Sequence, residues 1–151
     1  MIKYIFIFFF IFNTNLNANN KENIINNLKS TQNFNFEFEQ NINKKIEKGN
    51  CIVEYPKKIY CEYEGSSNKI LVSNGKSLVI KTKVGYYRYP IDKTPLNFIL
   101  DKKFLISRIY KLKERIIDNS IINYTIKENN YEVNIFFDER TFNLIGWQTK
   151  D

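Results

Sequence analysis

The chain has 151 residues and a formal net charge of +7, and it is rich in aromatic residues (16%) but contains no histidine. This length favours a single domain with a moderate core. Without histidine the chain lacks Ser-His-Asp triads and the usual zinc ligand sets, and it also lacks the glycine-rich patterns that bind nucleotide phosphates. We therefore predict a non-enzymatic protein with no cofactor, no metal site and no catalytic residues.

Residues 1–18 have the features of a secretory signal peptide. Lys3 gives a positive start, residues 4–12 form a short apolar stretch, and Ala18 supplies a small residue for cleavage. The apolar stretch is much shorter than the roughly 20 residues needed to cross a bilayer. We therefore expect residues 19–151 to be exported as one mature domain, with an uncleaved membrane anchor as the alternative.

The next segment is predicted to form a helix and then a series of strands. Residues 20–31 place three apolar side chains on one side of a helix, namely Ile24, Ile25 and Leu28. In residues 33–40, Phe34, Phe36 and Phe38 alternate with polar residues, which places the three rings on one face of a strand. Further strands are predicted at 42–48, 50–55, 58–64, 69–73, 76–82 and 85–89. Their short connections indicate an antiparallel meander.

The only two cysteines, Cys51 and Cys61, flank a turn at Pro56. If they face each other across a hairpin, Val53 lies opposite Ile59 and both cysteines share one face of the sheet. The resulting Cβ separation of about 4.5–5.5 Å is close to what a disulfide requires, and export places the chain in an oxidising compartment. We predict a structural Cys51–Cys61 disulfide.

The sequence ILVSNGKSLVI (70–80) predicts a hairpin with a tight turn at Asn74 and Gly75. Consecutive residues in both arms are apolar, so both faces of the sheet carry apolar side chains. Tyr86, Tyr87 and Tyr89 add an aromatic edge on the next strand. This apolar surface exceeds what one helix-covered face accounts for, and it indicates either a very deep core or a cavity for an apolar ligand.

The strands are interrupted after residue 90 by a helical segment. Thr94 and Pro95 are predicted to begin a short apolar helix, with the Thr94 hydroxyl as its cap. The pattern of residues 104–117 is amphipathic but does not distinguish helix from strand. Strands are predicted again at 120–127, 131–137 and 142–149. The expected fold class is α+β, mainly antiparallel β, with a curved sheet whose concave face is covered by helices.

The order of these motifs resembles the LolA family of periplasmic carriers, which move lipoproteins from the inner to the outer membrane. The resemblance rests on the helix and alternating phenylalanines ending at Gln40, on Gly49, on Pro56 with the aromatic strand after it, on ILVSNGK, and on the Thr94–Pro95 pair. It implies a curved, incomplete β-barrel (LolA/LolB-like) closed by helices over an apolar cavity. It also implies a monomer in the periplasm of a Gram-negative bacterium. The implied partners are lipoprotein acyl chains, an inner-membrane lipoprotein-releasing ABC transporter and an outer-membrane lipoprotein receptor.

The resemblance also assigns roles to individual residues. The lipid-binding cavity is expected to be lined by Phe34, Phe36, Phe38, Leu71, Leu78, Ile80, Tyr87 and Tyr89, and the lid is expected to contain Pro95, Leu96, Phe98, Ile99 and Leu100. The family latches its lid with an Arg before the proline matched by Pro56, where this chain has Tyr55, a hydroxyl donor without charge. Family members continue with further strands beyond residues 146–151. We therefore expect either a fragment or a shortened member with a more open barrel.

Two other interpretations stay open. The first is a LolB-like receptor or a general lipid-binding periplasmic protein of the same fold, although a receptor would carry a lipidated cysteine after its signal peptide, and none stands there. The second is a basic, aromatic-faced nucleic-acid binder, because rings and cations together grip single strands. The signal peptide argues against this second interpretation, so nucleic acid is not expected among the partners.

Overall fold

The computed structural model of the protein describes residues 19–42, 44–65, 68–128 and 130–150. Helix α1 (Asn20–Ser30) leads into a six-stranded antiparallel sheet in chain order, formed by β1 (Asn33–Ile42), β2 (Lys45–Glu54), β3 (Lys58–Tyr63), β4 (Ile70–Asn74), β5 (Ser77–Thr82) and β6 (Gly85–Pro90). After this sheet come the 3-10 helix η1 (Ile91–Lys93) and helices α2 (Leu96–Leu100) and α3 (Lys102–Lys111). The chain then forms a four-stranded sheet in the order β10–β9–β8–β7, from β7 (Arg115–Ile117), β8 (Ile121–Glu128), β9 (Tyr131–Asp138) and β10 (Leu144–Lys150).

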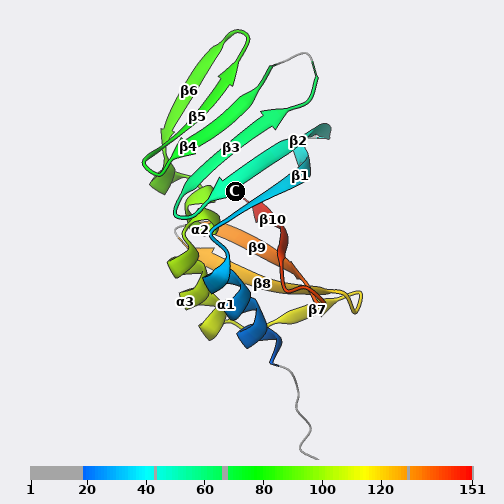
Figure 1. Ribbon diagram of the computed structural model, residues 1–151. Coiled ribbons are helices and arrows are strands. Elements are labelled where there is room, and N and C mark those ends of the chain that lie inside the picture. Colours follow the sequence, from blue (N-terminus) through cyan, green and yellow to red (C-terminus); the bar gives the residue numbers. More distant parts are fainter. Residues whose placement is uncertain (1–18, 43, 66–67, 129, 151) are drawn as a thin grey trace, which may run out of the picture.

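In the part of the chain that the structure describes, the two sheets are open and do not close into a barrel. The six-stranded sheet forms the upper half of the molecule, and α1 and α3 lie beside the four-stranded sheet in the lower half (Figure 1). The predicted α+β fold with mainly antiparallel strands is confirmed. The two sheets face each other, and in the described residues β1 and β10 do not pair through their backbones. This gap between the sheets corresponds to the predicted incompleteness of the barrel.

The strand register places the predicted apolar residues on one face of the six-stranded sheet. One row crosses the whole sheet and consists of Phe36, Cys51, Cys61, Leu71, Ile80 and Tyr87. The Cys51–Cys61 disulfide is present, with a Cα–Cα distance of 4.1 Å, and Val53 pairs with Ile59 as predicted. We call this face, which is turned toward α2 and β10, the inner face.

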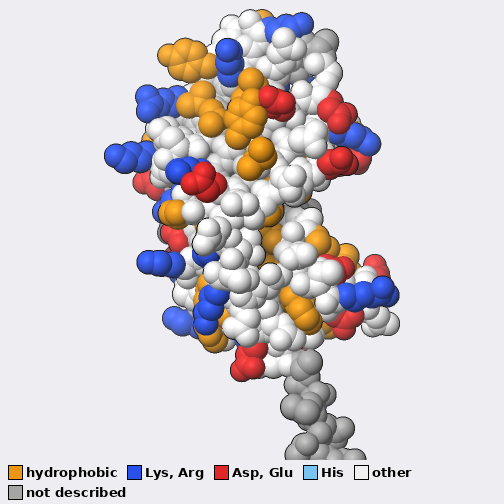
Figure 2. Space-filling view, in the orientation of Figure 1, with side chains coloured by type: hydrophobic (Ala, Val, Ile, Leu, Met, Phe, Trp, Pro, Cys, Tyr) orange, Lys and Arg blue, Asp and Glu red, His pale blue; other side chains and the backbone are white. Residues whose placement is uncertain are grey.

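The opposite, outer face of the same sheet also carries exposed apolar side chains. Ile52, Tyr60 and Val72 form a row on β2, β3 and β4 and are 57%, 40% and 36% exposed. Hydrophobic side chains gather over this sheet in the space-filling view, with charged side chains around them (Figure 2). The second apolar face of the 70–80 hairpin therefore meets solvent.

The four-stranded sheet packs against α1 and α3 to form the main core. Its inner residues are Ile122, Tyr124 and Ile126 on β8, opposite Phe137, Ile135 and Val133 on β9. The helices contribute Ile24, Ile25, Leu28, Leu105 and Ile109 to the same cluster. All of these side chains are buried, so α1 covers the core with the apolar side predicted from its sequence spacing.

Three local predictions were wrong or incomplete. The predicted strand 42–48 crosses a chain reversal, because β1 ends at Ile42 and β2 begins at Lys45, and Lys44 adopts a left-handed φ of 68° without a glycine to signal it. The Thr94 hydroxyl does not cap α2; it donates a hydrogen bond to the Ile91 carbonyl of η1 (2.8 Å). The ambiguous segment 104–117 contains most of α3 and strand β7.

None of the helices in the described ranges has the length and apolar character needed to cross a membrane. The predicted signal peptide at residues 1–18 lies outside the described residues.

Candidate functional site

The space between the two sheets, which we call the inter-sheet groove, contains two cavities that follow strand β1. The first, the sheet cavity, has a volume of about 320 Å³ and lies between the inner face of β1–β4, the start of α2 and strand β10. Its apolar and aromatic lining residues are Phe36, Phe38, Ile59, Tyr63, Leu71, Pro95, Leu96, Ile145 and Trp147, together with the disulfide. These residues come from five strands and one helix, so the cavity exists only in the folded chain.

The second, the helix cavity, lies at the other end of β1 and has a volume of about 350 Å³. Its apolar lining is formed by Leu28 from α1, by Phe34 and Phe36 from β1, by Tyr55 after β2, and by Phe142 and Leu144 near β10. Asparagines stand around this lining, and Asn27 donates hydrogen bonds to Asn143 Oδ1 (2.8 Å) and to the Thr141 carbonyl (3.2 Å). The helix cavity is therefore apolar inside with neutral polar groups at its rim.

Aromatic rings line the groove along β1. Phe34 stacks on Phe36, with 5.7 Å between ring centroids, and also lies 5.9 Å from the ring of Tyr55. Phe36 meets Trp147 of β10 edge to face at 5.8 Å, and Phe38 meets Tyr63 at 4.9 Å. The Phe36–Trp147 pair thus bridges the groove from one sheet to the other.

Several of the residues predicted for the cavity and the lid lie at the groove. Phe34, Phe36, Phe38, Leu71, Pro95 and Leu96 line its cavities. The other four predicted cavity residues share the inner face but lie beyond the lining: Leu78 is buried, Ile80 is half-buried, and Tyr87 and Tyr89 are exposed. The remaining predicted lid residues are packed in the protein interior, with Phe98 and Ile99 in the main core and Leu100 in the core of the six-stranded sheet.

Sequence reasoning missed the contribution of the last strand. Ile145 and Trp147 line the sheet cavity, and Phe142 and Leu144 line the helix cavity. The register of β10 shifts between Leu144 and Gly146, and such a bulge changes which alternate residues face inward. The only usable signal was the single Trp of the chain within a predicted strand, since a large aromatic residue is usually at least partly buried.

The predicted latch position differs from the expected arrangement. Tyr55 packs against Phe34, its hydroxyl has no hydrogen-bond partner among the described residues, and burial raises the pKa of Tyr55 to about 12. The neighbouring Lys57 instead contacts the end of α2. Its backbone N–H donates to the Leu100 carbonyl (2.8 Å), and its Nζ lies 3.2 Å from the Asp101 carboxylate. The turn between β2 and β3 is therefore attached to α2 through Lys57.

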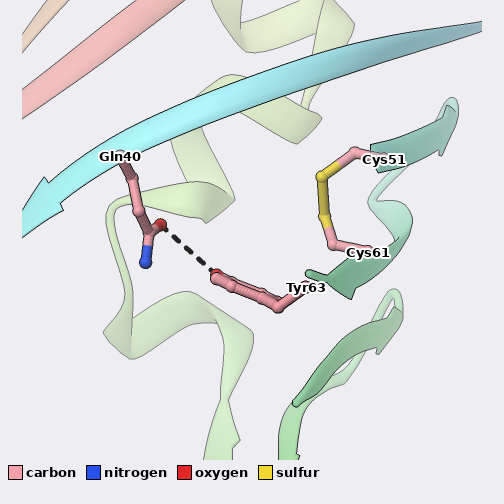
Figure 3. Close-up of a disulfide and its surroundings, with 4 residues drawn as sticks. All are labelled: Gln40, Cys51, Cys61 and Tyr63. Carbon is pink, nitrogen blue, oxygen red and sulfur yellow. Dashed lines mark hydrogen bonds between the residues drawn. A yellow bond between two sulfur atoms is a disulfide. The ribbon is translucent and has the colours of Figure 1, made fainter. Parts of the chain in front are cut away.

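A polar network closes one side of the sheet cavity. Gln40 and Tyr63 line the cavity near the disulfide, and the Tyr63 hydroxyl donates to Gln40 Oε1 at 3.3 Å (Figure 3). Gln40 also donates to Glu47 (3.0 Å), and Lys69 pairs with Glu47 at 2.7 Å. The hydrogen bond from Lys69, supported by Lys45, lowers the pKa of Glu47 to about 2. Glu47 is therefore ionised at neutral pH and holds two lysines at this end of the sheet.

The chemistry of the groove is that of an apolar binding surface. Phenylalanine, leucine, isoleucine and tryptophan side chains dominate the interior of both cavities, while Glu37 and Glu39 stand exposed at the edge of the sheet cavity. In residues 19–42, 44–65, 68–128 and 130–150, no group of three or more Cys, Asp or Glu side chains is placed to hold a metal ion. A concave, mostly apolar surface with a few polar groups at its rim suits a ligand with apolar chains.

Two open sheets with an aromatic groove between them form a fold and a surface that suit apolar ligands. The chain matches the family described as outer membrane lipoprotein carrier protein LolA over residues 29–151, from the end of α1 to the end of the chain. It therefore belongs to the LolA family, and its general role is that of a lipoprotein carrier or chaperone. No curated protein matches the chain.

Proposed function

We propose that the protein works in the periplasm of a Gram-negative bacterium and carries lipoproteins from the inner membrane to an outer-membrane acceptor. In this proposal an inner-membrane lipoprotein-releasing ABC transporter supplies the cargo and an outer-membrane lipoprotein receptor accepts it, with the carrier acting as a monomer. Membership of the LolA family supports the role of carrier. The single observation that supports the site is the aromatic inter-sheet groove, in which Phe36 of one sheet meets Trp147 of the other.

The acyl chains of the lipoprotein are proposed to bind in the inter-sheet groove. Phe34, Phe36, Phe38, Leu71 and Leu96 would supply the contact surface, because their side chains line its two cavities. Burial contributes about 0.8 kcal/mol per methylene, so a segment of about twelve methylenes contributes on the order of 10 kcal/mol before the costs of ordering. The phenylalanines of β1 remain half-buried in the protein alone, which leaves apolar surface for the ligand to cover.

Helix α2 is proposed to act as the lid of the sheet cavity. Pro95 and Leu96 at its start line the cavity, while Leu100 at its end is attached to Lys57. Phe98, Ile99 and Leu100 are packed in the core, so only the first turn of α2, with Pro95 and Leu96, would move away from the cavity to regulate release. In this chain Lys57 would hold the lid, which is the role that the resemblance gives to an Arg before the proline matched by Pro56.

A fluorescent acyl probe tests the proposed binding site. The purified mature protein is expected to bind the probe, and Phe36→Asp is expected to weaken binding at least about tenfold, because it places a charge between the two cavities. Ile116→Asp is the matched control, since Ile116 is exposed on β7 and lines neither cavity. Absence of probe binding, or equal binding by the wild type and Phe36→Asp, would contradict the proposal.

A transfer assay distinguishes a carrier from a protein that only stores lipid. The protein is loaded with a labelled lipoprotein and mixed with separated inner-membrane and outer-membrane vesicles. A carrier that transfers lipoproteins from the inner to the outer membrane delivers the label to the outer-membrane vesicles. Removal of the acceptor from these vesicles lowers delivery. A general lipid-binding protein would retain the label or distribute it equally between the two kinds of vesicle.

Export is tested by the mass of the protein isolated from cells. We expect the mature chain to begin at residue 19, after cleavage of residues 1–18. A mass that includes these residues would indicate a retained membrane anchor.

A further inference from the structure

The two cavities of the inter-sheet groove meet at one residue. Among the described residues, Phe36 alone lines both of them. The ring of Phe36 contacts Trp147 edge to face across the groove, and it also stacks with the ring of Phe34. Edge-to-face and stacked ring pairs attract each other beyond the effect of their buried area, so the rings are held where the two cavities join.

The two cavities are similar in size but differ in chemistry. At about 350 and 320 Å³, each has room for roughly ten groups of the size of a water molecule or a methylene, at about 30 Å³ per group. Among the described residues, no charged side chain lines the helix cavity, whereas the sheet cavity has the carboxylates of Glu37 and Glu39 at its edge. Each cavity alone is too small for more than one long acyl chain.

We propose that the Phe36–Trp147 ring pair divides the groove into two compartments, each of which holds one acyl chain. A diacyl lipid then straddles the ring pair, with one chain in the helix cavity and the other in the sheet cavity. The neutral asparagine rim of the helix cavity fits the ester or amide group at the head of an acyl chain, because amide side chains donate hydrogen bonds without requiring an opposite charge. This inference rests on the proposed acyl-binding function and adds to it the number and arrangement of the chains.

The stoichiometry of a single-chain ligand tests this division. Laurate is titrated into the mature protein and the complexes are counted by native mass spectrometry. The wild type is expected to bind two laurates. Leu144→Trp fills the helix cavity and Leu71→Trp fills the sheet cavity, and each is expected to leave one laurate bound. Ile116→Trp is the control, because it adds the same ring on β7 outside both cavities and is expected to leave two.

The dependence of affinity on chain length gives a second test that begins with the unaltered protein. Affinity for saturated fatty acids is expected to rise by up to about fourfold per methylene until one compartment is full, near twelve carbons, and then to level off. Phe36→Ala removes the ring that separates the compartments, so its affinity is expected to keep rising with longer chains. Phe38→Ala removes an equal ring that lines only the sheet cavity; it enlarges one compartment without joining the two, so the plateau is expected to move to slightly longer chains but to remain.

The outcomes separate this inference from the proposed function. One laurate bound to the wild type, or a plateau that Phe36→Ala leaves unchanged, overturns the two compartments while the acyl-binding function stands. No laurate bound to the wild type overturns both. Two laurates and a plateau that Phe36→Ala abolishes support the division by Phe36 and Trp147.

Discussion

The four-stranded and six-stranded sheets differ in how completely their inner faces are covered. In the four-stranded sheet, the inner residues of β8 and β9 are buried beneath α1 and α3. In the six-stranded sheet, the buried cluster is small and consists of Cys51, Val53, Ile59, Cys61, Ile91 and Leu100, with the phenylalanines of β1 only half-buried around it. At the far edge of this sheet, every residue of β6 is exposed.

This difference assigns separate physical tasks to the two halves. A densely packed half gives the free energy that keeps the chain folded, because burial of apolar side chains is the dominant stabilising contribution. A half with unfilled apolar surface has lower local stability and is able to adapt its shape. We call the half formed by the six-stranded sheet the open half. The Cys51–Cys61 disulfide, which links β2 and β3, lies in this half, where the apolar core is smaller.

The largest expected effect on stability comes from removing a ring in the four-stranded half, and removing a ring in the six-stranded half, in a separate variant, gives the comparison. Phe137→Ala, in the closed core of the four-stranded sheet, is expected to lower the free energy of unfolding by about 3–5 kcal/mol. Phe38→Ala, in the open groove, is expected to cost about 1–2 kcal/mol, because its ring is already partly exposed. Urea unfolding followed by circular dichroism measures both values. Equal losses would show that the two halves are packed alike.

Removal of the disulfide is the next largest change. Cys51→Ala combined with Cys61→Ala is expected to lower the free energy of unfolding by about 2–3 kcal/mol, because the closed loop is short, with a sequence separation of 10. Hydrogen exchange should show the loss mainly in β2 and β3, and much less in β8 and β9. Equal loss of protection in both sheets would contradict the idea that the disulfide compensates for the small core of the open half.

A smaller effect is expected where the open half is attached to α2. Lys57→Gln removes an ion pair with Asp101 whose side chains are about one-third exposed, so we expect a loss of at most about 0.5 kcal/mol and acyl-probe release about twofold faster. Lys58→Gln is the control, because Lys58 pairs with Glu54 on the outer face. If both variants release the probe at the wild-type rate, the contact of Lys57 with Asp101 does not hold the lid.

The smallest effect concerns the polar network beside the sheet cavity. The pKa of Glu47 is lowered from 4.5 to about 2, so its contribution to stability is present above about pH 4.5 and is lost as the pH falls toward 2. Glu47→Gln is expected to lower the unfolding free energy slightly at pH 7 and to match the wild type near pH 2. Glu39→Gln, which breaks an exposed pair with Lys48, serves as the control. A difference between wild type and Glu47→Gln that does not change with pH would contradict this assignment.

Local patterns in the sequence predicted most of the elements correctly. The alternation of Phe34, Phe36 and Phe38 placed three rings on one face of β1, and the spacing of the cysteines predicted their register and their disulfide. The reversal at Lys44 was missed because no glycine or proline marks it. In β10 the shift in register before Gly146 concealed which residues face the groove.

What the sequence determined by itself is therefore most of the strands, the Cys51–Cys61 disulfide and the side of α1 that is buried. These follow from interactions between residues close along the chain, which periodicity and spacing reveal. Only the tertiary structure decided that Phe36 meets Trp147 and that Lys57, rather than the Tyr55 hydroxyl, makes the polar contacts with the end of α2. It also decided that apolar residues on one face of the first sheet form a groove while those on the other face meet solvent. The physical reason is that these contacts join segments far apart in the sequence, and the relative placement of two sheets depends on the packing of the whole core.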